Sequence, residues 1–239
     1  MRIHEPEFKV RLATAADLAE VLSWLKSEWD GSSGFWGNRK MIQDGQQAGN
    51  LIVVGNESIQ VSGFLLATDS SMDIMEVRPE LQGRGLGSKL ALQGLHRIEQ
   101  SGRIGLVIQC QPSTSIPFWK RFGFHEVERG WADPEDHLEF AFPKVFELPA
   151  SRPVTEVRVE LSRSNGDVLK RGIFISKAVS IDDGRLQLAE RIAAYVEDGD
   201  TTVAISVGGE LVSSKKAKYS GAVGVEYAYP FIRLDAVYP

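Results

Sequence analysis

The chain of 239 residues is long enough for one large domain or for two ordinary domains with their own cores. Its content of 43% hydrophobic and 25% charged residues is typical of a globular protein and excludes a fibrous or disordered chain. The whole net charge of −5 lies in residues 1–148, and residues 149–239 are neutral. Neither part has the basic excess of a general polyanion binder, so nucleic acid is not an expected partner, although a local basic patch is not excluded.

Cysteine content and hydropathy indicate the compartment. Cys110 is the single cysteine, which excludes an intramolecular disulfide. Met1 is followed by charged residues and not by the apolar core of a signal peptide. No apolar run approaches the roughly 18 residues of a membrane span. We therefore expect a cytoplasmic protein with no membrane partner.

The first 148 residues alternate strand and helix patterns. Residues 8–30 read as a short strand, a turn at Thr14 and Asp17 that supplies a helix cap, and an amphipathic helix. A glycine-rich loop follows, and a second helix pattern covers residues 39–47. Later strand patterns lie at residues 50–54, 59–68, 72–77, 104–110 and 137–148, with helix patterns after residue 85 and within 113–124.

Two prolines and small residues at 147–156 mark a domain boundary, which divides the chain into domains 1–148 and 149–239. Alternating residues on both sides of Asn165-Gly166 predict a hairpin. Residues 182–200 read as a helix, and further strands are expected within 201–214 and 222–238. The expected helix would bury Leu186, Ala189, Ile192, Ala193 and Val196. The second domain is thus predicted to be a compact α+β domain.

The stretch "QGRGLGSKL" joins the strand at 72–77 to the following helix. A helix start leaves backbone N–H groups without partners and carries the positive end of the helix dipole. Glycines at 83, 85 and 87 let a bulky anion approach those amides, which indicates a phosphate or pyrophosphate site. The alternative is tight packing of strand against helix. The P-loop and Rossmann patterns do not fit, because the glycines are spaced GxGxG and no Lys-Ser/Thr pair follows in register.

The wider pattern resembles motif A of the GNAT superfamily of acyl-CoA-dependent N-acetyltransferases. That motif is [RQ]xxGx[GA] after a strand that ends in an apolar residue, any residue and Pro. Here it stands as Val77-Arg78-Pro79 followed by Gln82-Gly83-Arg84-Gly85-Leu86-Gly87. The resemblance extends to "RLATAADL", "SGFLLAT" and "PFWKRFGFHEV" and covers about residues 8–147. It implies an α/β fold with a central mixed sheet flanked by helices, joined here to the smaller α+β domain.

The resemblance also implies a function and a cofactor site. The protein would be an N-acetyltransferase in which an amine, on a small molecule or a protein, directly attacks acetyl-CoA as co-substrate, without a metal. The main chain of Val77 would bind the thioester carbonyl, where charge develops during attack. A bulge or splay in the "MEV" strand would open the gap for the pantetheine arm. The predicted cofactor-binding residues are Val77, Gln82, Gly83, Arg84, Gly85, Leu86, Gly87 and Ser88. Arg84 has the alternative of a solvated surface arginine.

An attacking amine must lose a proton, and a carboxylate or histidine has to take it. Asp73 is the first candidate, because a regular strand places it on the face of Met75 and Val77 and because it aligns with an acidic position often used in the family. Glu76 is the second candidate and points to the opposite face. Glu28, Asp30 and His125 remain alternatives, and all of these acids have the alternative of ordinary surface residues.

The chain departs from the family where many members carry a tyrosine that protonates the leaving thiolate. Trp119 stands there, and an indole cannot act as that acid. A CoA thiolate can leave unaided, since its thiol resembles that of cysteine, with a pKa near ~8.5. A catalytically silent acyl-CoA sensor is therefore the alternative function. Residues 149–239 are expected to recruit substrate or to form a homodimer through strand edges.

Overall fold

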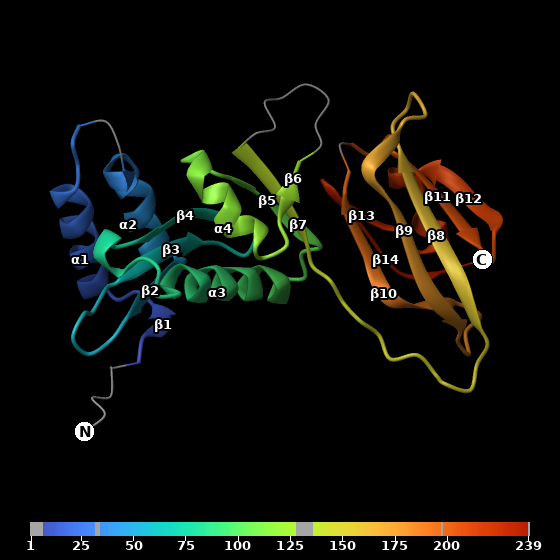
Figure 1. The fold of residues 1–239 in the computed structure, drawn as a ribbon, viewed down its shortest axis with the longest axis horizontal. Helices are drawn as coiled ribbons and strands as arrows, with labels where there is room; N and C mark the ends of the chain where they lie inside the picture. The colour runs from blue at the N-terminus through green and yellow to red at the C-terminus, as the bar shows by residue number, and fades with distance from the viewer. Residues whose placement is uncertain (1–6, 32–33, 128–135, 197, 239) are drawn as a thin grey trace. The chain divides into compact units, whose positions relative to one another are not determined.

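The computed structural model describes residues 7–31, 34–127, 136–196 and 198–238 (Figure 1). The chain forms two compact units, residues 1–103 and residues 104–239. Among the described helices, none is both long and apolar enough to cross a lipid bilayer. The expected α/β class, with an extra C-terminal part that has its own sheet, is confirmed.

The first unit has one antiparallel sheet in the order β1-β2-β3-β4, with helices on both faces. Strands β2 and β3 are buried along their whole length. Helices α1 and α2 cover one face, where residues such as Val21 and Ile42 pack against the sheet, and α3 covers the other face at Gly94. The strands are β1 (Lys9–Leu12), β2 (Leu51–Gly55), β3 (Gly63–Ala67) and β4 (Met72–Val77), and the helices are α1 (Ala15–Ser27), η1 (Phe35–Asn38), α2 (Arg39–Gln47), η2 (Pro79–Leu81) and α3 (Leu86–Gln100).

Helix α1 begins where the sequence predicts. Thr14 is the N-cap, and its side chain accepts from the amide of Asp17, while the Asp17 carboxylate accepts from the amide of Thr14. This reciprocal pair satisfies two of the N–H groups at the helix start. The buried Asp17 carboxylate also pairs with Arg11, which holds the pKa of that carboxyl well below its usual range. The start of α1 is thus closed by its own side chains.

The second unit contains two antiparallel sheets, with the strand orders β5-β7-β6 and β12-β11-β8-β9-β10-β14-β13. The mixed sheet expected for the first 148 residues is thus present as two antiparallel sheets. One is β1-β2-β3-β4 in the first unit, and the other is β5-β7-β6 in the second unit. The strands are β5 (Gly105–Gln109), β6 (His125–Glu126), β7 (His137–Ala141), β8 (Val154–Ser162), β9 (Val168–Ser180), β10 (Leu186–Tyr195), β11 (Thr202–Val207), β12 (Glu210–Lys216), β13 (Glu226–Ala228) and β14 (Phe231–Val237). The helices are η3 (Ser113–Ser115), α4 (Ile116–Lys120), η5 (Ala217–Tyr219) and η6 (Gly221–Val223).

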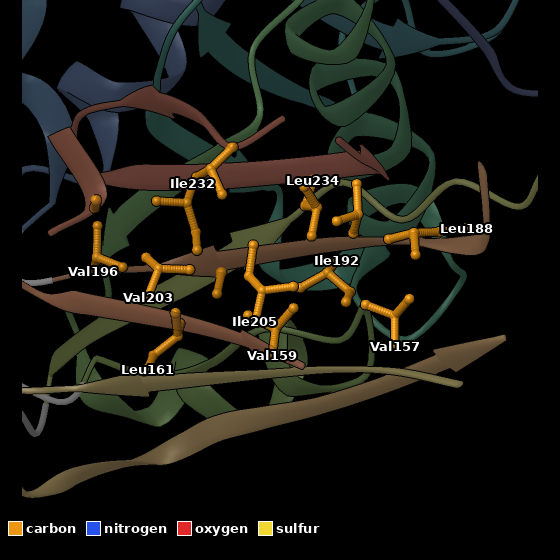
Figure 2. Packing of buried hydrophobic residues seen from close by; sticks show 14 of the residues in the cluster. Val157, Val159, Leu161, Leu188, Ile192, Val196, Val203, Ile205, Ile232 and Leu234 are labelled. Atoms are coloured by element: carbon orange, nitrogen blue, oxygen red, sulfur yellow. The ribbon is translucent and has the colours of Figure 1, made fainter. Parts of the chain in front are cut away.

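The seven-stranded sheet curls around a single apolar core. In Figure 2, Ile232 and Leu234 of β14 face Val203 and Ile205 of β11, although three strands lie between β11 and β14 in the sheet order. The hairpin predicted at Asn165-Gly166 joins β8 to β9, with Gly166 at φ 89° in the left-handed region that favours glycine. Along β8 every second residue, Val157, Val159 and Leu161, points into the core.

The helix predicted within residues 182–200 is wrong, because Leu186–Tyr195 is strand β10. Its apolar residues recur at spacings of four, as between Leu188 and Ile192, which suits a helix face. In the structure the pairing of β10 with β14 is interrupted between Gln187 and Ile192. Residues in the interruption pair with residues 144–146 instead, through Phe146 N to Ala189 O at 2.8 Å and Arg191 N to Lys144 O at 2.8 Å. The part of the second domain that the structure describes contains no α-helix after Lys120, so an antiparallel β-domain replaces the expected α+β domain.

The compact units divide at residues 103/104, and not at the boundary of 148/149 expected from the sequence. Residues within 104–127 and 136–148 share a core with the C-terminal strands, in which Ile104 and Val127 pack with Tyr195 and Phe231. The sequence boundary follows the two prolines and small residues at 147–156, whereas the compact units follow the packing. The assignment of domains 1–148 and 149–239 stays a prediction.

Candidate functional site

The free edge of β4 presents backbone donors. β4 ends the four-stranded sheet, and Arg78 N donates to Ser62 O at 3.0 Å on the β3 side. Hydrogen-bonded pairs alternate along an antiparallel ladder, and Val77 lies opposite Gly63 as the next position. The N–H of Val77 therefore points away from β3. The carbonyl of Val77 accepts from Gln82 Nε2 at 3.1 Å, which ties this edge to the glycine loop.

A bulge interrupts β4 four residues before Val77. Leu66 pairs with Ile74 but Ala67 pairs with Met72, so Asp73 is the extra residue. Met72 lies against Gly94 of α3, whereas Ile74 packs in the core beneath α1 and α2. A regular strand would put both on one face. The bulge expected in "MEV" is thus present, but at Asp73.

The glycine loop lies between η2 and α3 and leaves its amides open. Gly83 and Gly85 both have φ of +78°, and a Cβ built on either would meet no heavy atom within 4 Å. Gly85 is the N-cap of α3, and no side chain caps this helix, in contrast to α1. Among the described residues, none accepts a hydrogen bond from the amides of residues 83–88. Lys89 N, which donates to Gly85 O at 3.1 Å, is the first amide of the helix ladder.

This loop fits a pyrophosphate. The amides at the start of a 15-residue helix carry the positive end of its dipole, and the missing side chains at Gly83 and Gly85 leave open space over them. Arg84 is exposed and makes no hydrogen bond or ion pair to another described residue, so its guanidinium is available to an anion. Leu86 is buried and anchors the first turn, so only its amide is open toward the loop.

Glu76 is an uncompensated carboxylate on the α1 side of the sheet. It lies opposite Phe64 on β3 and on the same face as Ile74. Its Oε2 is buried and has no hydrogen-bond partner. Burial and, second, the negative charge of Glu28 raise the pKa of Glu76 to about 7. At neutral pH this group can therefore take up a proton and release it again.

The cation nearest in sequence to Glu76 is occupied elsewhere. Arg78 donates from Nε to Val61 O at 2.8 Å and from a terminal nitrogen to Glu20 Oε1 at 3.1 Å. Its guanidinium also lies 4.9 Å from the centre of the Trp24 ring. Trp24 is buried, and its Nε1 has no hydrogen-bond partner. An acceptor without a partner, Glu76 Oε2, and a donor without a partner, Trp24 Nε1, thus lie beneath α1.

The other predicted base, Asp73, is exposed on the bulge and accepts from Ser71 Oγ at 3.1 Å. The face expected for it, with Met75 and Val77, assumed a regular strand, which the bulge removes. The sequence ranks Asp73 above Glu76 because of the face expected for it and its alignment with an acidic position of the family. Burial of Glu76 leaves no sign in the spacing of a strand. Sequence reasoning also missed the Glu20–Arg78 pair, whose members lie 58 positions apart.

Trp119 and Cys110 belong to the second unit and are core residues. Trp119 packs edge-on against Phe124 at 5.3 Å and Phe118 at 5.0 Å. Cys110 is buried, and burial raises the pKa of its thiol, which opposes a covalent acyl role.

Comparison with known proteins agrees with this geometry. Residues 52–132, from β2 onward, match the family described as FR47-like protein, which is related to the GNAT acetyltransferases. A 155-residue stretch is 26% identical to mycothiol acetyltransferase of Gordonia bronchialis. Both sequence matches support the resemblance of this part of the chain to the GNAT superfamily. The matched stretch is 53% of this chain and 47% of that relative, so the chain spans about half the length of the curated relative.

Solved structures similar to the GNAT-like part have low identity. PH1933 from Pyrococcus horikoshii is 14% identical with a TM-score of 0.46, over 57% of this chain and 99% of its own. The GNAT family N-acetyltransferase YhbS from Escherichia coli, solved in complex with CoA, is 17% identical with a TM-score of 0.45, over 59% of this chain and 84% of its own.

Proposed function

We propose that this protein is an acetyl-CoA-dependent N-acetyltransferase that transfers the acetyl group directly to an amine. The observation that carries the proposal is the set of open amides at residues 83–88 beside the Val77 N–H at the edge of β4, with Gln82 donating to the Val77 carbonyl between them. The first would hold the pyrophosphate, and the second would donate to the thioester carbonyl. The similarity to the GNAT superfamily and the name of the curated relative support acetyl transfer.

Glu76 is the group that we assign as general base. An aliphatic ammonium is mostly protonated at neutral pH, so the carboxylate has to take its proton, directly or through a water. The amine nitrogen then bonds to the carbonyl carbon, the C–S bond breaks, and the CoA sulfur leaves with the electron pair. A carboxylate with a pKa of about 7 matches this task, because it is partly ionised at the pH where it must accept the proton. Asp73 is the second candidate.

Two acidic groups, Glu28 and Glu76, lie close enough to interact, and aromatic residues pack around the same face at Trp24, Phe35 and Trp36. This environment favours an acceptor that brings a positive charge. Whether the amine is carried by a small molecule or by a protein, and the cytoplasmic location, stay predictions.

The test has two steps on the full-length protein. Isothermal titration calorimetry with acetyl-CoA should show binding, and absence of binding would exclude the proposal. Incubation with acetyl-CoA and a panel of primary amines should give acetylated products in mass spectra. Binding without any product would favour a silent acyl-CoA sensor, the alternative that the buried Trp119 supports because it offers no proton to a leaving thiolate.

A further inference from the structure

A cavity of about 690 Å³ lies entirely within residues 104–239. One wall comes from the end of α4, the turn that follows it, and strands β6 and β7, and the other wall comes from β9 and β10. Its volume is in the range of small-molecule sites, roughly 300–1,000 Å³. None of its lining residues belongs to the proposed acetyl-CoA site at residues 77–88.

The apolar part of the lining is mainly aromatic. Phe140 stacks on Phe124 with ring centres 5.0 Å apart and planes at 30°. Phe174 of β9 is half-buried, and Tyr195 of β10 is packed edge-on against Phe231 at 5.8 Å. Gly123, at φ +90°, places no side chain over the Phe140 ring, which its Cβ would approach to 3.6 Å. A planar apolar group can therefore reach this surface.

The polar part of the lining is basic. It contains Lys120, Lys170 and Arg171 against Glu126 and Glu139, a net charge of 3 − 2 = +1 with His125 neutral, in a chain of net charge −5. Both carboxylates already have cationic partners, Glu126 with Lys120 at 2.6 Å and Glu139 with Arg171 at 3.1 Å. The acids are thus neutralised from within the lining.

His125 reports the sign of this electrostatic environment. The pKa of His125 is lowered. Burial is the largest cause, and the positive charges of Arg171 and Lys120 are the smaller causes. A negative group placed in the cavity would oppose the effect of these charges and raise the pKa of His125 again. An anion in the cavity would therefore be attracted, whereas a cation would be repelled.

We propose that this cavity binds a small organic anion with a planar apolar body, carrying a carboxylate or a phosphate. The body would stack on Phe140 and Phe174, and the anionic group would accept charge-assisted hydrogen bonds from Lys170 and Arg171. This site is separate from acetyl transfer and stands whether or not that reaction is found.

The test follows the imidazole signals of His125 by NMR in the full-length protein, assigned with His125→Gln. Benzoate and phenyl phosphate are the anionic probes, and benzylamine is a probe of similar shape with the opposite charge. We expect at least one of the two anions to shift the His125 signals and to raise the pKa of His125. The anion that binds more tightly shows whether the cavity prefers a carboxylate or a phosphate. The proposal is overturned if neither anion shifts the signals at millimolar concentration, or if benzylamine binds as tightly as the anions.

Two lysines on β9 provide a matched pair of variants. Lys170 lines the cavity and Lys177 does not, and both are exposed, so both variants should fold. Lys170→Gln should weaken binding of the better anion about tenfold, the size of one charge-assisted hydrogen bond, and Phe174→Ala should weaken it as well. Lys177→Gln should bind as the unsubstituted protein does. An equal loss in Lys177→Gln, or no loss in Lys170→Gln, would contradict the assignment of this cavity.

Discussion

The chemistry proposed for Glu76 depends on Arg78, the nearest cation along its strand, being held by other groups. Arg78 lies two residues along the same strand, but Glu20 and the Val61 carbonyl occupy its guanidinium. Glu76 therefore keeps the full effect of burial and of the Glu28 charge on its pKa. One ion pair at the edge of the sheet thus preserves a base that can work near neutral pH.

Glu76→Gln should lower kcat/KM by about 100-fold or more, because the amide cannot accept the proton. In the unsubstituted protein, kcat/KM should rise with pH up to about 7 and then level off, as the Glu76 carboxyl ionises. The variant should lose this dependence. Steady-state rates between pH 5 and pH 9 measure both effects. If Asp73→Asn removes the pH dependence and Glu76→Gln retains it, Asp73 is the base.

Thermal unfolding of Glu76→Gln provides a control that does not involve catalysis. The pKa of Glu76 is raised from 4.5 to about 7 on folding, so the folded state binds the proton more tightly. Between these two values the contribution of Glu76 to stability falls as pH rises. The variant should therefore have a higher Tm than the unsubstituted protein at pH 8, with a smaller difference at pH 5. An equal difference at both pH values would show that the carboxyl titrates normally.

Two helices of the first unit begin in opposite ways. The first amides of α1 are satisfied by Thr14 and Asp17, whereas those of α3 have no side-chain cap. The chain thus closes one helix start and leaves the other available, at the place where two glycines keep the space clear. The element that we assign to the pyrophosphate is therefore the start of α3 as a whole.

Glycines at the two ends of α3 allow a matched test of this assignment. Gly85 (φ +78°) precedes the helix and Gly102 (φ +84°) follows it, and a Cβ on either meets no heavy atom within 4 Å. Alanine at either position should cost about 1–2 kcal/mol through the left-handed backbone alone. Gly85→Ala should also weaken acetyl-CoA binding at least tenfold in calorimetry, because its methyl group occupies the anion's space. Equal affinities in Gly85→Ala and Gly102→Ala would refute the proposed cradle.

Across the whole molecule, compactness and family resemblance divide the chain differently. The GNAT resemblance runs to about residue 147, yet residues within 104–127 and 136–148 pack with the C-terminal strands. Phe231 of β14 lies so close to Gly105 of β5 that a Cβ on the glycine would be 2.6 Å from the ring. The C-terminal strands therefore complete the packing around the end of the GNAT-like part. A homodimer through these strands stays a prediction.

Phe231→Ala in the full-length chain should destabilise the second unit by about 3–5 kcal/mol, because it leaves a cavity in a shared core. Amide hydrogen exchange should become faster in β5 as well as in β14. Tyr219→Ala, at a position that is 66% exposed, is the control and should change neither. Protection of β5 that is unaffected by Phe231→Ala would show that the two parts of the unit are stable independently.

The sequence by itself determined the local features. Thr14 and Asp17 predicted the start of α1, Asn165-Gly166 predicted the β8–β9 turn, and the spacing of the glycines predicted an open helix start. Each depends on groups a few residues apart, whose hydrogen bonds and backbone angles follow from residue type.

Only the tertiary structure decided the remainder. Residues 186–195 form a strand because distant segments, among them residues 144–146, supply their hydrogen bonds. The bulge at Asp73 depends on the pairing with β3, and the pKa of Glu76 depends on burial and on a charge from the end of α1. The cavity lined by Phe140 and Phe174 also joins segments far apart in the chain. Pairing, desolvation and long-range charge act between groups that meet only after folding, and the order of residues does not contain them directly.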